Sequence, residues 1–128
     1  MTGDRRILVV DDDADVRAMV RAVLEAEGYA VDTANDGFAA LRAVDSTAPD
    51  CVVLDVMMPG MDGHGVLTRI RAGARAALPV VMLTAAADDS QAWQAWTEGV
   101  DYFLAKPFEP EELLRFLDYL FQQRSITA

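Results

Sequence analysis

Four short apolar runs in this 128-residue chain each end in a side chain that can do chemistry. If the runs are strands of a parallel sheet, their carboxyl ends meet at one edge, where α/β proteins place their ligands. Asp55, which follows the wholly apolar Cys51–Leu54, lies at the centre of this pattern. The other members are Asp11 and Asp12 after Ile7–Val10, Thr84 after Val80–Leu83, and Lys106 after Tyr102–Ala105.

Three carboxylates at one edge repel each other, and a bound cation relieves that repulsion. Oxygen ligands that leave room for water favour Mg²⁺ over Zn²⁺. A carboxylate that stays ionised beside Mg²⁺ can attack phosphorus and form an aspartyl phosphate. Lys106 and the hydroxyl of Thr84 would stabilise the negative charge on the transferring group. The pattern therefore predicts capture of a phosphoryl group by Asp55.

The elements that position these residues alternate along the whole chain. Five apolar, β-rich runs predict strands, and segments with three- and four-residue apolar spacing predict five helices between and after them. This alternation indicates an α/β fold, a doubly wound five-stranded parallel sheet with helices on both faces. The strand order 2-1-3-4-5 is one of the two common solutions. Besides the runs above, the ranges are a strand at 29–34 and helices at about 16–27, 38–44, 63–70, 88–98 and 109–123.

Length and composition favour a single globular domain over residues 1–128, with a core of about 6–123. Hydrophobic residues make up 52% of the chain, which disfavours disorder. The net charge of −10 disfavours direct binding to nucleic acid or to an anionic membrane. The single cysteine, Cys51, cannot form an internal disulfide, and no apolar run is long enough to span a bilayer. We therefore expect a cytoplasmic domain.

Four segments together carry a resemblance to a known family. ILVVDDD, VVLDVMMPGMDG, VVMLTA and YFLAKPF resemble, in order and spacing, the signature segments of bacterial two-component response-regulator receiver domains, the CheY-like proteins. The resemblance extends from about Arg6 to Gln123. Each segment alone is weak evidence for the family, because an aspartate after an apolar strand is common. Four such segments in the same order are highly specific.

The resemblance implies roles for individual residues at the acidic edge. Asp55 would accept a phosphoryl group from a histidine of a partner kinase or histidine phosphotransfer protein. Asp12 would bind Mg²⁺ directly, Asp11 would hold a metal-bound water, and the main-chain carbonyl of Met57 would complete the protein's ligands together with Asp55. Lys106 would pair with the phosphoryl oxygens, and its bond to Pro107 is expected to be cis.

The resemblance also implies a switch. Thr84 would move toward the phosphoryl group, and Phe103 would then rotate inward. The surface formed by the fourth predicted helix, 88–98, the fifth strand, 102–105, and the fifth helix, 109–123, would change shape for a downstream protein or output domain. Phe116 and Tyr119 add aromatic area to that surface and suggest a possible homodimer through it.

Catalysis is expected to be limited to the protein's own phosphorylation and slow dephosphorylation. Met57 and Ala86, two residues beyond Asp55 and Thr84, cannot orient a water molecule for hydrolysis.

Other polar and aromatic residues have simpler interpretations. Asp13, Asp36 and Asp62 are expected to cap helices or form turns, and His64 to be polar surface. Cys51 is expected to be a buried small hydrophobe. Trp93 and Trp96 lie three apart on one helix face, where packing against the sheet is favoured.

The sequence bears on three alternative functions. A phosphatase of the haloacid dehalogenase type needs an acid where Met57 stands. A flavodoxin-like FMN binder needs a Ser/Thr/Gly-rich loop where this chain has three aspartates. The complete set of acids, threonine and lysine argues against an interaction module that works without phosphate, but that alternative stays open. The cognate kinase, the stimulus, the output target and any longer parent protein are not specified by these residues.

Overall fold

Short, β-branched and almost wholly apolar segments form the strands, because such residues suit a sheet covered on both faces. The computed structural model describes the backbone of residues 5–84 and 94–127, and the side chains of residues 5–84 and 94–122. The elements along the chain are β1 (Arg6–Val10), α1 (Ala14–Ala26), β2 (Ala30–Ala34), α2 (Gly37–Thr47), β3 (Cys51–Asp55), α3 (Gly63–Ala72), β4 (Val80–Thr84), β5 (Tyr102–Ala105) and α5 (Pro110–Thr127).

All five strands are parallel and follow the order β2-β1-β3-β4-β5, which confirms the predicted fold class and strand order. β1 and β3 lie at the centre of the sheet with β4, so the strands that end in Asp11, Asp55 and Thr84 are direct neighbours. Leu83 of β4 is the register partner of Asp55, and Ala105 of β5 is the partner of Thr84.

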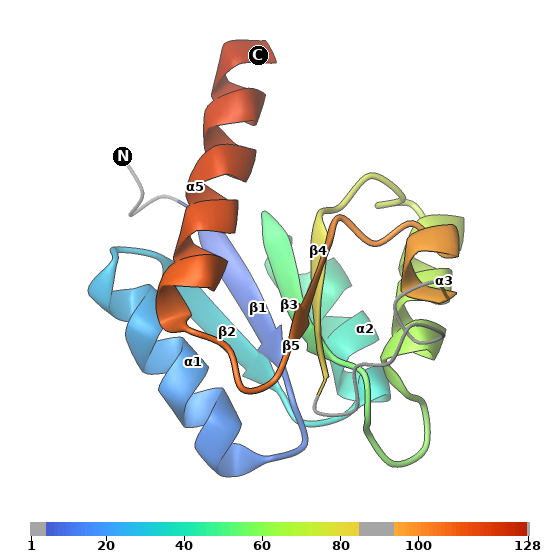
Figure 1. Cartoon of the computed structure of the whole chain (residues 1–128). Helices are drawn as coiled ribbons and strands as arrows, with labels where there is room; N and C mark the ends of the chain where they lie inside the picture. Colours follow the sequence, from blue (N-terminus) through green and yellow to red (C-terminus); the bar gives the residue numbers. More distant parts are fainter. Residues whose placement is uncertain (1–4, 85–93, 128) are drawn as a thin grey trace.

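Alternate residues of each central strand point to opposite faces of the sheet, as the period of a strand requires. Ile7 and Val9 pack with residues of α1 and α5, whereas Leu8 and Val10 pack with residues of α2 and α3. Figure 1 shows this arrangement, with α1 and α5 on one side of the sheet and α2 and α3 on the other. Both faces are therefore covered by apolar cores, and the polar groups are left to the strand ends.

Aspartates begin three of the helices. Asp13, Asp36 and Asp62 are the N-caps of α1, α2 and α3, and each side chain accepts a hydrogen bond from a main-chain N–H of the first turn. An aspartate is among the best residues for this position, because it satisfies an N–H group that the helix itself leaves without a partner. The predicted cap or turn roles of these three residues are confirmed.

The fourth predicted helix, residues 88–98, lies only partly within the described chain. Residues 94–97 are helical, and the remainder from 88 to 93, with Trp93, is outside the described residues. Trp96 is 51% exposed, so the prediction that it packs against the sheet is wrong. Ala95 is fully buried and occupies the inward position of this turn instead.

His64 was predicted to be polar surface, and this is also wrong. It is 5% exposed, and its Nδ1 lies 2.6 Å from Oε1 of Glu98. The contact joins the first turn of α3 to the end of the helical segment 94–97, thirty-four residues away in sequence. Cys51 is fully buried, as predicted. No helix in the described part of the chain is long and apolar enough to cross a membrane.

Candidate functional site

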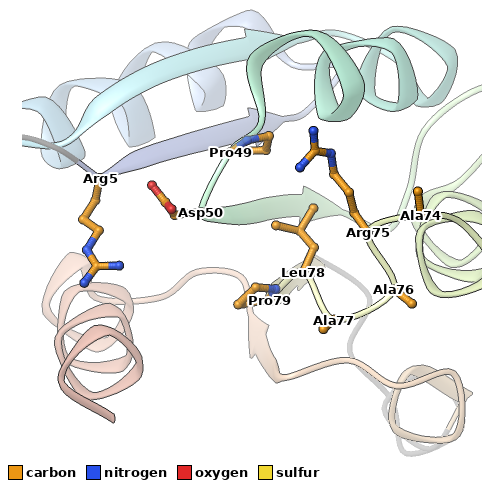
Figure 2. A pocket seen from close by; sticks show the side chains of 9 residues that line it. All are labelled: Arg5, Pro49, Asp50, Ala74, Arg75, Ala76, Ala77, Leu78 and Pro79. Carbon is orange, nitrogen blue, oxygen red and sulfur yellow. The ribbon is translucent and has the colours of Figure 1, made fainter. Parts of the chain in front are cut away.

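The amino ends of the strands form a polar hollow that is not the predicted site. A pocket of about 430 Å³ opens there, and Arg5, Asp50 and Arg75 are the charged side chains that line it (Figure 2). The carboxylate of Asp50 already accepts a hydrogen bond of 2.7 Å from the main-chain N–H of Arg6. The acids that the sequence singled out lie at the other edge of the sheet.

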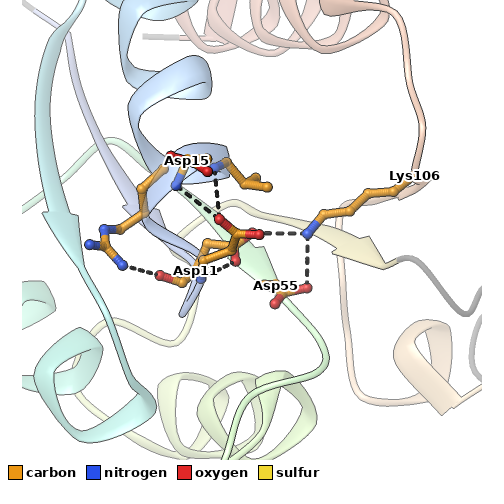
Figure 3. Close-up of polar contacts among 7 residues, drawn as sticks. Asp11, Asp15, Asp55 and Lys106 are labelled. Atoms are coloured by element: carbon orange, nitrogen blue, oxygen red, sulfur yellow. Dashed lines mark hydrogen bonds and ion pairs between the residues drawn. The ribbon is translucent and has the colours of Figure 1, made fainter.

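At the carboxyl edge, Asp11 and Asp55 share one lysine. Nζ of Lys106 lies 2.9 Å from Oδ2 of Asp11 and 3.3 Å from Oδ1 of Asp55, as the dashed lines in Figure 3 show. Asp11 and Asp55 are 2% and 4% exposed. Three residues that are 95 and 51 positions apart in sequence thus meet in a largely buried ion cluster.

Asp12 completes a group of three carboxylates and is its exposed member. One oxygen from each of Asp11, Asp12 and Asp55 lies within 4.8 Å of one oxygen from each of the others. An all-oxygen donor set of this kind, open to solvent at one acid, suits a hard cation that keeps some of its water. The residues present therefore fit Mg²⁺, as the sequence predicts.

Burial and nearby negative charge raise the pKa of Asp55 from 3.8 to about 6. Burial is the largest cause, and the negative charges of Asp11 and Asp12 add to it. Lys106 opposes the shift through its charge and its hydrogen bond but does not cancel it. Asp55 therefore lies in a site with more negative charge than its single lysine neutralises.

Lys106 responds in the opposite sense. Burial alone would lower its pKa, but the hydrogen bond to Asp11 and the charges of Asp55 and Asp11 outweigh burial and raise the pKa above its usual value. The ammonium therefore stays charged at neutral pH and is held at the acid cluster. The bond between Lys106 and Pro107 is cis, as predicted.

The backbone that carries Asp11 is held at the end of β1 by local hydrogen bonds. Its N–H donates to the carbonyl of Ala34, and Oδ1 of its side chain accepts from the N–H of Asp13 at 2.9 Å. Asp13 in turn caps α1. The acidic run thus leaves the strand and enters the helix through one continuous set of contacts.

Gly63 is a residue of the site that the sequence analysis treated only as a helix start. A Cβ there would lie 2.5 Å from the main-chain oxygen of Asp55 and 2.8 Å from Cα of Val56. No side chain fits such a gap, so α3 can pack directly behind the acceptor strand only with glycine at its first position. The sequence signal was the Asp62-Gly63 pair, which also resembles an ordinary turn.

The remaining predicted residues that the structure describes lie at or near the ends of β3, β4 and β5. Thr84 is fully buried at the end of β4, and its carbonyl accepts from the N–H of Lys106 at 2.7 Å. Phe103 is partly buried and packs against the core between the sheet and α2 and α3. Met57 is 55% exposed just after β3, whereas Ala86 lies outside the described residues.

Aromatic side chains gather where β5 meets α5. The rings of Tyr102 and Phe116 stack in parallel with centroids 4.7 Å apart, and Tyr119 is 62% exposed. These residues line a hollow of about 220 Å³ together with Glu112 and Arg115. Phe116 thus packs against Tyr102 within the chain, and of these three aromatic residues Tyr119 is the exposed one.

Comparison with known proteins gives a consistent picture. The family model described as "Response regulator receiver domain" matches residues 7–118. The solved structure of a CheY-like receiver domain protein from Methanospirillum hungatei has a TM-score of 0.90 at 25% identity and covers 97% of this chain and 98% of its own. The chemotaxis protein CheY4 of Vibrio cholerae has a TM-score of 0.84 at 34% identity, over 90% of this chain and 97% of its own.

Two relatives that match this chain are longer proteins. The transcriptional regulatory protein ResD of Bacillus subtilis is 38% identical over 127 residues, which are 99% of this chain and 52% of ResD. The DNA-binding response regulator MtrA of Mycobacterium tuberculosis is 44% identical over 110 residues, 86% of this chain and 47% of MtrA. The chain therefore spans about half the length of these relatives. The fold, the acidic edge and the matched family model agree, and the chain belongs to the response regulator receiver domain family of two-component systems.

Proposed function

We propose that this receiver domain takes a phosphoryl group onto Asp55 from a phosphohistidine of a partner kinase or phosphotransfer protein. The observation that carries the proposal is a buried carboxylate with a raised pKa, held between a second acid and the shared ammonium of Lys106. A carboxylate in this setting is a nucleophile whose excess charge a cation and an ammonium can balance.

In the transfer, one oxygen of Asp55 forms a bond to phosphorus as the bond between phosphorus and the histidine nitrogen breaks. The leaving nitrogen keeps the electron pair of that bond. Lys106 donates to the phosphoryl oxygens as they approach Asp55. This bond replaces its present contact with the Asp55 carboxylate. A bound Mg²⁺ would supply further positive charge for the same oxygens, with Asp12, Asp55 and the carbonyl of Met57 as ligands and Asp11 holding a metal-bound water.

Phosphorylation adds close to two negative charges at the edge where Thr84 and Phe103 lie. We propose that the hydroxyl of Thr84 then turns toward the phosphoryl group and that Phe103 moves further into the core. The surface of residues 94–98, β5 and α5 would change with it. The relatives that are DNA-binding regulators suggest an output domain in a longer protein, while the charge of −10 argues against direct DNA contact by this domain. The sequence-based expectation of a cytoplasmic location stays a prediction.

Intact mass spectrometry after incubation with acetyl phosphate and Mg²⁺ tests the acceptor. The wild-type protein should gain one phosphoryl group, and a metal chelator should prevent the gain. Asp55→Asn should gain none, whereas Asp50→Asn, which changes the carboxylate before the same strand, should react like wild type. An adduct of equal yield on Asp55→Asn would refute the assignment.

We propose further that the protein is no enzyme with an external substrate and that its phosphoryl group is lost slowly. Met57, exposed beside the site, has no group that holds a water molecule for attack on phosphorus. The decay of the adduct in Mg²⁺ after removal of the donor measures this. Half-loss within seconds would contradict it.

Self-association is a separate proposal for the aromatic surface of Tyr102, Phe116 and Tyr119. Tyr119 has an exposed ring beside the stacked pair, and burial of such a ring in a protein interface is energetically favourable. Light scattering with and without beryllofluoride, a phosphoryl mimic, should show a dimer that Tyr119→Ala weakens. Only monomer in both conditions would exclude a homodimer through this surface.

A further inference from the structure

An arginine of α1 contacts the backbone between the first two acids. Nη1 of Arg17 donates a hydrogen bond of 2.8 Å to the main-chain oxygen of Asp11. Arg17 is the fourth residue of α1 and is partly buried, and its own N–H donates to the carbonyl of Asp13. The guanidinium therefore reaches back over the helix start to the end of β1.

The carbonyl that Arg17 holds belongs to the peptide unit that joins Asp11 to Asp12. The carboxylate of Asp11 is already held on both oxygens, by the N–H of Asp13 and by Lys106. Asp12 differs, because it is exposed and no hydrogen bond to its carboxylate is found within the described residues. The direction of the Asp12 side chain therefore depends on the backbone, and Arg17 restrains that backbone.

We propose that Arg17 is a positioning residue of the acid cluster: by holding the Asp11–Asp12 peptide, it aims Asp12 at the cation site. The inference rests on the proposed function, since it concerns the same Mg²⁺. In this proposal Arg17 is a ligand of neither the cation nor the phosphoryl group and acts only through the peptide. Outer contacts of this kind commonly change metal affinity by one to two orders of magnitude.

Charge and position predict opposite effects when Arg17 is removed. An arginine beside three carboxylates lowers their attraction for a cation, so loss of its charge alone would tighten Mg²⁺ binding. Loss of the hold on the peptide would weaken binding. The sign of the change in affinity therefore separates the positioning role from a purely electrostatic one.

Arg21 offers a matched control. It lies one turn further along α1, is exposed, and pairs with Glu25 at 3.1 Å rather than with the acidic loop. Arg17→Met and Arg21→Met remove the same charge and keep a similar side-chain stem. Only the first removes the hydrogen bond to Asp11.

The experiment is a calorimetric titration of Mg²⁺ into the metal-free protein, without any phosphoryl donor. We expect Arg21→Met to bind Mg²⁺ as wild type does or slightly more tightly, and Arg17→Met to bind about tenfold more weakly. Amide NMR shifts of Asp12 and Asp13 in the metal-free protein should move in Arg17→Met alone. Binding by Arg17→Met as tight as that of Arg21→Met would overturn the inference.

Folding and the proposed function are checked in parallel. Thermal unfolding in chelator shows whether each variant is folded, and Arg17→Gln gives the same comparison if Arg17→Met is not. Wild-type protein that forms the Asp55 adduct, with Arg17 variants that bind Mg²⁺ like the control, would overturn this inference alone. Wild-type protein that binds no Mg²⁺ would overturn both the proposed function and the role of Arg17.

Discussion

The two edges of the same sheet use aspartates in different ways. At the amino edge, Asp50 accepts from the N–H of Arg6, and Asp101 accepts from the N–H of Val80 and from Arg71. Each of these acids closes a gap in main-chain hydrogen bonding where a strand begins. At the carboxyl edge, three acids converge and have a single lysine among them.

The difference distinguishes acids that stabilise the fold from acids that serve a site. Asp50 and Asp101 each use one carboxylate oxygen, Oδ2, to accept from main-chain N–H groups or from an arginine, and these contacts add to stability. An uncompensated cluster costs stability, and it persists where a cation or phosphoryl group is to be bound. Burial and the charges of Asp11 and Asp12 raise the pKa of Asp55, as such a cost would require.

The largest effect is expected from Lys106→Met at the carboxyl edge. Loss of the ammonium removes the charged donor for the phosphoryl oxygens, and the rate of adduct formation with acetyl phosphate should fall by about a hundredfold or more. Arg71→Met, at the other edge, should leave the rate of the folded protein within a few fold. Both rates are read from intact mass against time. A Lys106→Met rate within tenfold of wild type would contradict the assigned role.

At the amino edge, the expected effect is on stability. Arg71 donates to the carbonyls of Gly99, Ala76 and Leu78 and to the carboxylate of Asp101. Arg71→Met leaves these acceptors without their charged donor, so the free energy of unfolding should fall by about 2 kcal/mol. Urea titration measures the loss. Arg75→Met, an exposed neighbour, should change stability by no more than about 0.5 kcal/mol, and an equal loss in both variants would count against the comparison.

The smallest effect concerns Asp55 and pH, in metal-free buffer with chelator. Because folding raises the pKa of Asp55 from 3.8 to about 6, the folded state binds this proton more tightly, and the stability cost of the Asp55 side chain should fall as pH falls from 7.5 to 4. Asp55→Asn lacks this titration and should be about 1 kcal/mol more stable than wild type at pH 7.5, allowing for solvent screening. The advantage should disappear by pH 4.

Asp50→Asn is the control for this measurement at the amino edge. Its carboxylate already accepts from the N–H of Arg6, so no gain in stability is expected at pH 7.5. Denaturant midpoints at several pH values give both results. An advantage of Asp55→Asn that persists unchanged at pH 4 would show that the ionisation of Asp55 is not its cause.

Local patterns predicted well wherever a local rule decides the structure. The apolar runs became the strands, and Asp13, Asp36 and Asp62 became helix caps. Local reasoning was wrong at His64, whose buried ring contacts Glu98 far away in sequence, and at Trp96, which is half exposed. The helical pattern alone does not show whether Ala95 or Trp96 faces the sheet.

Arg17, Gly63 and Arg71 were missed for a related reason. Arginine on a helix and glycine at a helix start are common, and nothing in their spacing shows that Arg17 reaches the Asp11 carbonyl or that Asp55 leaves no room for a Cβ at residue 63. Each of these roles depends on how closely a residue approaches the backbone of another segment. Approach distances follow from the packing of whole elements, which no short segment encodes.

By itself, the sequence determined that Asp11, Asp12, Asp55, Thr84 and Lys106 share one edge, because parallel strands all end on the same side of a sheet. Only the tertiary structure decided that Lys106 bridges Asp11 and Asp55, that Asp12 stays exposed, and that the proton of Asp55 is held more tightly than usual. The physical reason is that interactions between charges depend on separation and on exclusion of water, and both arise only when the strands and helices are packed together.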